Sequence, residues 1–379
     1  LARHSGEIAR LGEDYVWLDP EDIDRIEKKL SSRRAPGYAE RLRAVLTGKL
    51  DGARVVASSD ILAELRRMNR SIEVRLPESV HATLRPYQMR GFCWLVKNLK
   101  LGLGSLIADD MGLGKTLQVI AAIAWLKDEG GLERGRVLAA VPASLLVNWV
   151  REIRRFAPSL SCAIYHGQDR RLPGQEQMPD VLLTTYGTLR RDFDALSKRR
   201  WRLLVLDEAQ AVKNTGTEAY GAASAFPASQ VIAMTGTPVE NRLMEYWSIF
   251  SIVQPGFLGS ASEFRTNFVN PIEGEHDPEV SEAFRRLVAP LMLRRVKTDR
   301  SVIEDLPERL VQDVPVRLLP AQAALYERAL QEALPAISEA EKGGAKDRVR
   351  RKALVLRLIT ELKQICNSPS QYLKTREPE

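Results

Sequence analysis

Two glycines precede a lysine and a threonine in the segment IADDMGLGKT, between an apolar run and a stretch with helical periodicity. Gly112 and Gly114 would let the backbone curl until successive N–H groups point at one anion, and the following helix N-terminus adds a positive dipole. In such a loop Lys115 can reach the β- and γ-phosphates of a nucleotide and Thr116 can coordinate Mg²⁺. The strict phosphate-loop pattern has glycine where this chain has Asp109, so the segment alone leaves open a Gly-rich turn without ligand.

A second pair of candidate residues ends the apolar run of LLVLDEAQ. Asp207 could bind Mg²⁺ through water, and Glu208 could accept a proton from an attacking water molecule. A lone Asp-Glu pair after a strand is usually only a solvated turn. The phosphate-loop pattern earlier in the chain favours the catalytic interpretation.

A candidate base-reading residue lies upstream of the loop, in TLRPYQMRGFCWL. Thr83 as N-cap and Pro86 in the first turn predict a helix here. The amide of Gln88 can both donate and accept, which matches the N6/N7 edge of adenine. A single glutamine on a helix is normally a surface residue, so this interpretation depends on its position before the loop.

Short apolar runs alternate with amphipathic segments from about Leu84 onward. This alternation predicts an α/β doubly wound parallel sheet, in which ligands bind at the carboxyl ends of the strands. In one expected helix, Leu145, Trp149, Ile153 and Phe156 share an apolar face. The expected strands are 105–109, 136–141, 181–185, 203–208 and 231–235, and the expected helices between them include 116–127 and 144–156.

The start of the chain differs from this middle part. Residues 1–77 predict a small helical accessory domain, with one helix starting at Asp19-Pro20 and another around 60–68. No catalytic constellation occurs there, and the lobe that holds the candidate residues is expected to span 78–300.

Beyond Gly256 the chain turns mainly helical and charged. A helical insertion is expected over about 256–298. Further on, a long helix is predicted over 320–340 and a second one over 347–366, separated by Gly343-Gly344.

Composition narrows the class of protein. The chain has 56 Lys and Arg against 49 Asp and Glu, a net charge of +7, and a pI near 9.3. This balance fits a polyanionic partner, although many proteins without one are equally basic. Cys93, Cys162 and Cys366 are scattered and odd in number, which disfavours a zinc site or disulfide framework and suits a reducing cytosol. No apolar run approaches the ~20 residues needed to span a bilayer, there is no signal-peptide pattern, and the start at Leu1 suggests a fragment.

In their order along the chain, the motifs resemble those of superfamily 2 helicase-like motors, specifically the SWI/SNF-type ATPases. The resemblance covers roughly residues 80–379. Its most specific parts are DDMGLGKT, TGTPVEN and LRRVKTD taken together. The motifs are LRPYQMRG (84–91), DDMGLGKT (109–116), VPASLLVNWVREIRRF (141–156), TTYGTLRRD (184–192), DEAQAVKN (207–214), MTGTPVENRL (234–243), LMLRRVKTD (291–299) and LKQICNSPS (362–370).

The resemblance implies a role for each motif. Gln88 would read adenine with Arg85 beside it, Asp207 and Thr116 would hold Mg²⁺, and Glu208 would activate water. Gln210 stands where many relatives have histidine. The loop residues expected at ATP are Asp110, Met111, Gly112, Leu113, Gly114, Lys115 and Thr116. Those expected to couple hydrolysis to lobe movement are Thr235, Gly236 and Thr237. Those expected to contact the DNA backbone are Ser144, Thr185, Tyr186, Lys213 and Asn214.

Several cationic residues keep two interpretations. Arg294 and Arg295 could form a structural salt-bridge cluster or a coupling and DNA element. His166 has no visible partner in the sequence, which favours a loop histidine over a catalytic one. A solvated helix face or phosphate contacts would each explain Arg151, Arg154 and Arg155.

The resemblance implies the first RecA-like lobe of an ATP-driven translocase on double-stranded DNA, of bacterial or archaeal type, with ATP and Mg²⁺ as cofactors. Two alternatives stay open: a strand-separating DNA or RNA helicase, and a non-catalytic binding module that retains nucleotide. We expect a cytoplasmic, nucleoid-associated protein with duplex DNA as partner and no membrane contact. The N-terminal domain could add a protein partner.

The motifs of the family's second lobe do not occur in these residues. Residues 301–379 are therefore expected to form a helical connection and the truncated start of that lobe. One missing motif bears the arginine that completes the family's ATP site. Because such an arginine is worth on the order of 10³–10⁵ in rate, we expect residues 1–379 alone to hydrolyse ATP slowly.

Overall fold

The structure is a computed structural model of the 379-residue chain. It describes residues 8–11, 14–17, 43, 49–50, 53–54, 70–236, 243–299, 312, 314–341 and 345–374. The chain divides into two compact units, Leu1–Leu306 and Pro307–Glu379.

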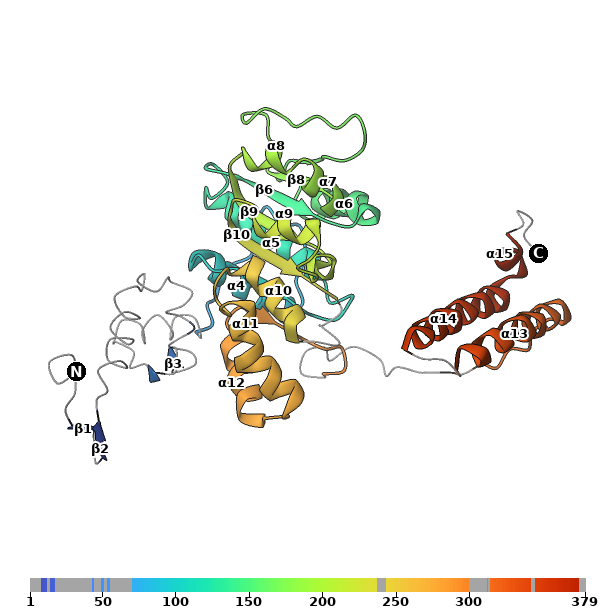
Figure 1. The fold of residues 1–379 in the computed structure, drawn as a ribbon. Coiled ribbons are helices and arrows are strands. Elements are labelled where there is room, and N and C mark those ends of the chain that lie inside the picture. Colours follow the sequence, from blue (N-terminus) through green and yellow to red (C-terminus); the bar gives the residue numbers. More distant parts are fainter. Residues whose placement is uncertain are drawn as a thin grey trace. The chain divides into compact units, whose positions relative to one another are not determined.

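A seven-stranded sheet forms the centre of the first unit (Figure 1). Every neighbouring pair of strands is parallel, so the predicted doubly wound α/β sheet is confirmed. All carboxyl ends therefore lie at one edge. In spatial order the strands are β11 (Met292–Leu293), β5 (Ser105–Ile107), β10 (Ala228–Met234), β9 (Trp201–Leu206), β6 (Arg136–Ala140), β8 (Val181–Thr184) and β7 (Cys162–Ile164).

Helices connect these strands, and their starts follow local sequence signals. Pro86 opens α4, where its missing N–H costs no hydrogen bond. Gly114, in the left-handed region, precedes α5. The helices of this unit are α4 (Pro86–Lys100), α5 (Lys115–Asp128), α6 (Leu146–Phe156), α7 (Tyr186–Arg191), α8 (Phe193–Ser197), α9 (Glu218–Ser224), α10 (Leu243–Val253), α11 (Ala261–Phe264) and α12 (Pro278–Val288), with the short 3₁₀ turns η2 (Ala143–Leu145) and η3 (Ala209–Val212) and the π-helical η4 (Arg265–Gly274).

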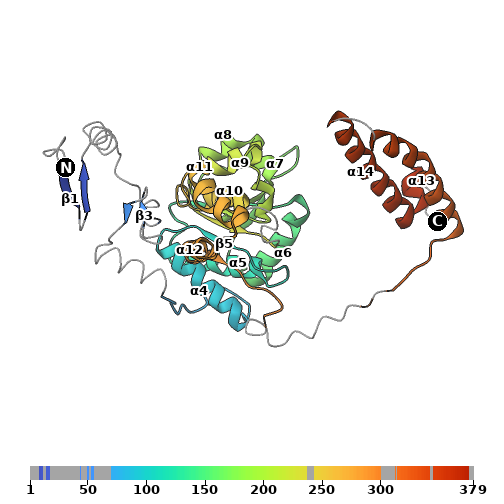
Figure 2. The same cartoon turned by 60° about the horizontal axis from the view of Figure 1, so that its bottom comes forward.

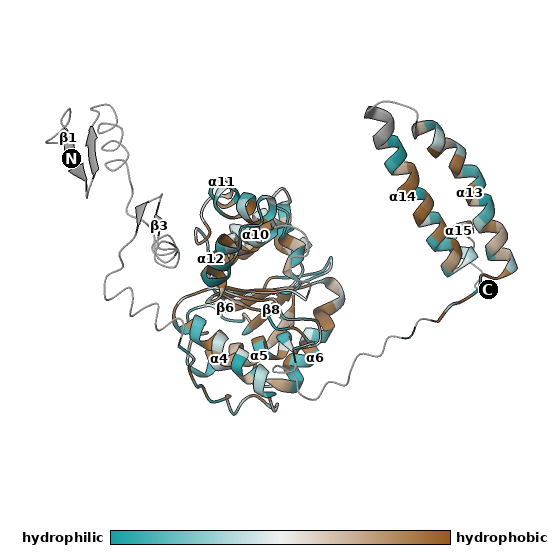
Figure 3. Cartoon of the chain, turned by 90° about the horizontal axis from the view of Figure 1, so that it is seen from below, coloured by the Kyte–Doolittle hydropathy of each residue, from teal (hydrophilic) through white to brown (hydrophobic). Residues whose placement is uncertain are grey.

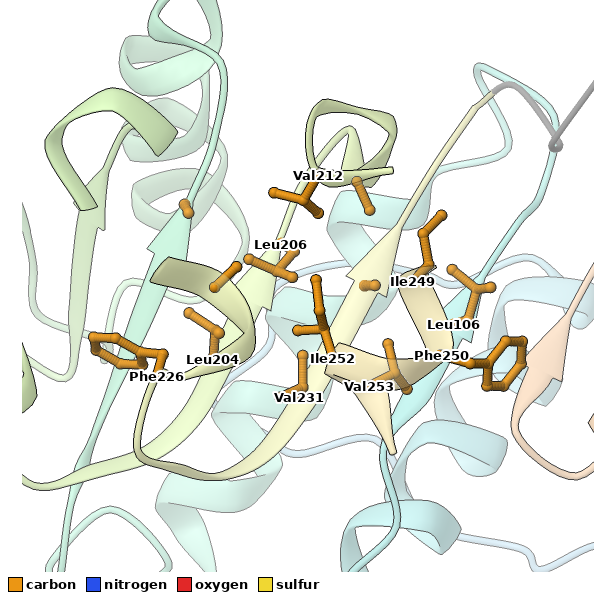
Figure 4. Packing of buried hydrophobic residues seen from close by; sticks show 14 of the residues in the cluster. Leu106, Leu204, Leu206, Val212, Phe226, Val231, Ile249, Phe250, Ile252 and Val253 are labelled. Carbon is orange, nitrogen blue, oxygen red and sulfur yellow. The ribbon is translucent and has the colours of Figure 1, made fainter. Parts of the chain in front are cut away.

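Helices cover both faces of the sheet, because successive strand side chains point to opposite sides (Figure 3). Val137, Ala139 and Val205 join the core beneath α4, α5 and α6. Leu204 and Leu206, the intervening residues of β9, face the other core. Figure 4 shows that second core, where they lie with Val231, Phe226 and the α10 residues Ile249, Ile252 and Val253. Burial on both faces explains why the strands are continuous apolar runs.

Two strands of the seven-stranded sheet were not expected from the sequence. The edge strand β7 follows α6, and β11 lies inside the segment predicted to be a helical insertion over 256–298. The helices of that segment end at Val288, after which the chain returns to pair with β5. The short length of both strands left no periodic signal.

Residues before the lobe include two antiparallel strand pairs, β1 (Ile8–Leu11) with β2 (Asp14–Trp17) and β3 (Lys49–Leu50) with β4 (Ala53–Arg54). The sequence pattern predicted helices and no strands there. The helices expected after Asp19-Pro20 and around 60–68 lie outside the described residues.

The second unit contains the helical hairpin α13 (Pro320–Glu341) and α14 (Ala345–Asn367), followed by α15 (Pro369–Leu373) (Figure 2). The amide of Gln322 donates to the carbonyls of Ile365 and Cys366 and ties the two long helices together. Both long helices match their predicted ranges within two residues at each end. Over the described residues of the chain, no helix is long and apolar enough to cross a membrane.

Candidate nucleotide-binding site

Three neighbouring strands bring the candidate residues to the carboxyl edge of the sheet. The phosphate loop (residues 109–116) follows β5, Thr235 follows β10, and Asp207 and Glu208 follow β9. A cavity of about 420 Å³ lies between the loop and α6. Its lining includes Met111, Gly112, Gly114, Lys115, Thr116, Trp149, Asp207 and Glu208.

The phosphate loop has the backbone that its glycines were expected to allow. Gly112 and Gly114 have φ of 79° and 74°, a region that favours glycine. The ammonium of Lys115 donates to the carbonyls of Asp109 (2.7 Å) and Asp110 (3.1 Å), the first residues of its own loop. Burial lowers the pKa of Lys115, although nearby carboxylates act in the opposite direction. Phosphate oxygens could replace these two carbonyls as acceptors.

The departure from the strict loop pattern, Asp109, has a structural explanation. Its side chain is fully buried and forms an ion pair with Arg295, whose Nε lies 3.0 and 3.1 Å from the two carboxylate oxygens. Arg295 also donates to Gln118 Oε1 (2.8 Å) and to the carbonyl of Tyr87. The arginine therefore ties β11, α4 and α5 to the start of the loop, which supports the salt-bridge interpretation for Arg295. Arg294 is exposed.

Asp207 is buried and lines the cavity. Its Oδ2 accepts from the indole Nε1 of Trp149 (2.8 Å), and its Oδ1 accepts from the backbone N–H of Glu208 (3.0 Å). Neither donor is charged. Burial raises the pKa of Asp207, and the Trp149 hydrogen bond opposes that effect only in part.

Glu208 stands in a strained backbone conformation, with φ 51° and ψ 56°. Non-glycine residues seldom adopt this region, and strain of this kind clusters at functional sites. The Glu208 carboxylate accepts from Gln210 Nε2 (2.7 Å), and Gln210 Oε1 accepts from the Thr235 hydroxyl (2.9 Å). Thus Gln210 links the Asp-Glu pair to the end of β10.

Gly236 completes this side of the site. A Cβ at this position would come within 2.6 Å of Met111 Cγ and 3.5 Å of Lys115 Nζ, so a larger residue would require the Met111 side chain to move away from the loop. Thr237, the third expected coupling residue, lies outside the described residues.

Gln88 packs directly against the loop. Its Oε1 accepts from the backbone N–H of Arg85 (3.0 Å) and its Nε2 donates to the carbonyl of Leu113 (3.3 Å). An amide oxygen has a second lone pair and an NH₂ group a second hydrogen. The side chain can therefore hold the loop and still offer one donor and one acceptor to a base. Arg85 contributes through its backbone, and its side chain is exposed.

A family model described as the SNF2-related domain matches residues 87–371, most of the chain. The chain belongs to the SNF2-related family. A putative ATP-dependent helicase/translocase of Bacillus subtilis is 34% identical, over 100% of this chain and 43% of the relative. The TATA-binding protein-associated factor of Saccharomyces cerevisiae is 31% identical, over 84% of this chain and 18% of its own length. The chain thus spans less than half of these relatives.

Among solved structures, the SWI2/SNF2 ATPase core of Sulfolobus solfataricus in complex with double-stranded DNA matches with a TM-score of 0.58 and 39% identity. The match covers 80% of this chain and 63% of that chain. The sheet of this SNF2-related chain is therefore the RecA-like fold, and the family resemblance seen in the motifs is confirmed.

Three residues of the SNF2-related lobe that were expected to contact DNA lie near the same edge of the sheet. They differ in exposure and in their hydrogen bonds. Ser144 is exposed in η2. Thr185 is buried, and its hydroxyl caps α7 by accepting from the N–H of Thr188 (3.2 Å). Tyr186 donates its hydroxyl to the carbonyl of Asp207 (2.7 Å). The Thr185 hydroxyl thus caps a helix and the Tyr186 hydroxyl bonds the backbone next to the cavity, and Ser144 is the one exposed residue of these three.

The remaining expected contacts also take part in local structure. Lys213 pairs with Glu245 at 3.2 Å, with its side chain 46% exposed. Asn214 accepts from the N–H of Gly216 (3.0 Å) and shapes the turn before α9. Arg151, Arg154 and Arg155 form an exposed face of α6.

His166, assigned to a loop from the sequence, has a partner after all. Its Nδ1 lies 3.1 Å from the hydroxyl of Thr188, beside the α7 cap. The position is structural, outside the cavity lining.

The contribution of α6 to the cavity was not predicted from the sequence. Asn148, Trp149 and Glu152 all line it, and Asn148 donates to Glu152 Oε1 (3.1 Å). Burial raises the pKa of Glu152. A signal existed, because a buried indole N–H needs a hydrogen-bond acceptor. Trp149 was considered only as part of the apolar face.

Proposed function

We propose that this chain binds Mg²⁺·ATP and hydrolyses it as the ATP-binding lobe of a translocase on double-stranded DNA. The observation that best supports this is the convergence of Lys115, Asp207 and Glu208 on one cavity from two different strands. Membership of a family whose relatives are named as ATP-dependent supports ATP as the nucleotide.

Oxygen donors at the cavity suit Mg²⁺. The Thr116 hydroxyl and the Asp207 carboxylate are hard ligands, and Mg²⁺ takes few protein ligands beside phosphates and water. When bound, Mg²⁺ would neutralise charge on the phosphates.

The remaining chemistry falls to the chain's own residues. Lys115 would exchange its two loop carbonyls for phosphate oxygens. Glu208, oriented by Gln210, would accept the proton of the attacking water. Because Gln210 also bonds Thr235, a shift of that segment would move the Glu208 carboxylate, which would couple hydrolysis to movement of a second lobe.

Nucleotide binding provides the first test. By calorimetry with Mg²⁺, the Lys115→Ala variant should show no measurable ATP binding. The Glu208→Gln variant should bind ATP normally, because Glu208 is expected to act on the attacking water and not on the bound nucleotide. Lys198→Ala, an exposed lysine at the end of α8, is the matched control and should bind like the wild type. Normal ATP binding by Lys115→Ala would remove the proposal's basis.

Base selectivity tests the role of Gln88. Its remaining hydrogen-bonding capacity fits adenine, so ATP should bind more tightly than GTP. Gln88→Ala should lose that preference and also weaken the loop contact to Leu113. Equal affinity of the wild type for both nucleotides would contradict the adenine role.

The proposal that the chain acts on duplex DNA is supported by the similar Sulfolobus core, whose structure contains double-stranded DNA. If the chain contacts the DNA backbone, the logarithm of its DNA affinity should fall linearly with the logarithm of the salt concentration, with a slope of about −0.9 per phosphate neutralised. Lys213→Ala should reduce that slope by about 1 if Lys213 meets a phosphate. Unwinding of a blunt duplex would favour the strand-separating helicase instead.

Residues 1–77 are proposed to form an accessory domain with a protein partner. The Bacillus alignment includes these residues, since it covers the whole chain, whereas the yeast one covers 84%. Residues 301–379 are proposed to be the helical connection to a second lobe. A protein of this kind would work at the nucleoid of a bacterium or archaeon.

A further inference from the structure

Trp149 occupies an unusual place for a core tryptophan. It lies in the first turn of α6, is 1% exposed, and belongs to the core that α5 and α6 cover. Yet its indole N–H emerges at the cavity and donates to Asp207 Oδ2 at 2.8 Å. The largest fully buried side chain of the structure therefore ends on the carboxylate expected to hold Mg²⁺.

We propose that Trp149 is a positioning residue that fixes the Asp207 carboxylate for Mg²⁺·nucleotide binding. This inference rests on the proposed function, because it needs Asp207 to hold the metal.

The torsion that orients a carboxylate is soft, since the Cβ–Cγ bond of aspartate has a broad, two-fold profile. At Asp207 two hydrogen bonds restrict it from opposite oxygens, one from the Glu208 amide and one from Trp149. The Glu208 donor sits on the next residue of the same strained turn and moves with it. Trp149 is anchored independently by the core, so it supplies the fixed reference for the carboxylate plane.

Each Asp207 oxygen accepts one described hydrogen bond and keeps a further lone pair. An indole can fill one of them without adding a positive charge, which would compete with Mg²⁺. A lysine or arginine at the same distance would hold the carboxylate equally well but would repel the cation. Residues that orient metal ligands in this way typically contribute 10–100-fold to metal affinity.

The test uses Trp149→Phe, which keeps an aromatic ring in the core and removes the N–H. Its matched control is Trp201→Phe. Trp201 is 3% exposed and its indole donates to the carbonyl of Leu196 at 2.7 Å, away from the cavity. Both variants lose one buried indole hydrogen bond in the same lobe, so they share any general structural cost.

The measurement is ATP affinity as a function of Mg²⁺ concentration. Trp149→Phe should need at least about tenfold more Mg²⁺ for half-maximal ATP binding, with metal-free ATP affinity unchanged. Trp201→Phe should match the wild type in both. An unchanged Mg²⁺ requirement in folded Trp149→Phe overturns the inference. If the wild type shows no Mg²⁺-dependent ATP binding, the proposed function itself fails.

A second measurement does not depend on a folded Trp149→Phe variant. In the wild-type chain labelled at the indole nitrogens of its six tryptophans, Mg²⁺ added to the ATP-bound protein should shift the Trp149 N–H resonance. The Trp201 resonance should stay in place. If Trp149→Phe does not fold, the Trp149 N–H resonance of the wild type is assigned by elimination, with single Phe variants of the other tryptophans. A Trp149 resonance that ignores Mg²⁺ would also overturn the proposal.

Discussion

Two aspartates with the same burial lie at opposite edges of the sheet, and their surroundings differ completely. Asp180, just before β8, and Asp207, just after β9, are each 6% exposed. Asp180 accepts from Lys127 (2.8 Å), Arg136 (3.2 Å) and both the amide and the hydroxyl of Ser161. Asp207 accepts only uncharged donors among its described hydrogen bonds.

The pKa values of these two groups move in opposite directions. Burial alone would raise the pKa of Asp180, but the hydrogen bonds from Lys127 and Ser161 outweigh it and the pKa is lowered. At Asp207 burial prevails and the pKa is raised. At the amino edge of the sheet, protein donors thus compensate the buried charge of Asp180. At the carboxyl edge, the buried Asp207 carboxylate lacks such compensation and would be stabilised by a bound cation.

Asp109 sharpens this comparison and carries the largest predicted effect. It lies at the carboxyl edge like Asp207, but Arg295 compensates its charge. Asp109→Asn would leave a guanidinium that is 9% exposed among neutral acceptors. Loss of one partner of a buried ion pair typically costs about 3–5 kcal/mol, so the free energy of unfolding should fall by that amount in urea denaturation.

ATP affinity should fall in the same variant, because Arg295 anchors the start of the phosphate loop. Arg286→Ala, an exposed arginine on α12, is the control and should alter neither quantity. A loss of stability below about 1 kcal/mol, the median for surface pairs, would mean that the Asp109 pair is not structural.

Asp207→Asn should give the reverse pattern. Mg²⁺·ATP affinity should fall at least 100-fold, or about 2.7 kcal/mol. The loss of stability should be smaller than at Asp109, because asparagine removes a charge that burial disfavours. Its single amide oxygen can accept from only one of the two donors, Trp149 Nε1 or the Glu208 N–H. Calorimetry and urea denaturation of the same preparation measure both. A variant as destabilised as Asp109→Asn would show that the Asp207 charge is compensated in the free protein.

The sequence predicted most of the fold because its buried strands are long apolar runs and its helices have clear starts. β9 and β10 were recognised, and α14 was expected after the Gly343-Gly344 pair. The three-residue strand β7 and the two-residue strand β11 were not predicted, because a run of two or three residues is too short to show a hydrophobic periodicity. Tertiary pairing alone makes them strands.

At the candidate site, the sequence predicted which residue types lie there but not the ion pairs and hydrogen bonds that they form. Lys115, Asp207 and Glu208 were identified because each sits next to a strand or helix end. The Arg295–Asp109 pair joins residues far apart in sequence, and no local pattern encodes such a contact. Tyr186 was expected to contact phosphate, yet its hydroxyl bonds the Asp207 carbonyl. Only the tertiary packing of the start of α7 against the segment after β9 determines this contact.

Asp180→Asn tests the amino edge. Its cationic partners keep some access to water, with Lys127 35% and Arg136 27% exposed, so they can be rehydrated when the carboxylate is lost. The cost should therefore be smaller than at Asp109, about 1–2 kcal/mol in the free energy of unfolding. Mg²⁺·ATP affinity should not change. A fall in that affinity would show that the two edges are not independent.

The smallest effect, and the most direct comparison of the two edges, is the pH dependence of stability. The folded pKa of Asp180 lies below the unfolded value of about 3.9, so its contribution is complete above that pH and is lost as the pH falls through the folded pKa. The folded pKa of Asp207 is raised, so protonation favours the folded state. Its unfavourable contribution at neutral pH should diminish as the pH falls towards about 4.

These signs predict two difference curves with opposite slopes. The free energy of unfolding of the wild type minus that of Asp207→Asn should rise as the pH falls from 7 towards about 4, without nucleotide. The wild type minus Asp180→Asn should be flat over that range and fall below about 4. Saturating Mg²⁺·ATP should reverse the Asp207 curve alone, because a bound cation stabilises the ionised carboxylate. Curves of the same sign without nucleotide would mean that both edges compensate their aspartates alike, and the contrast between them would be lost.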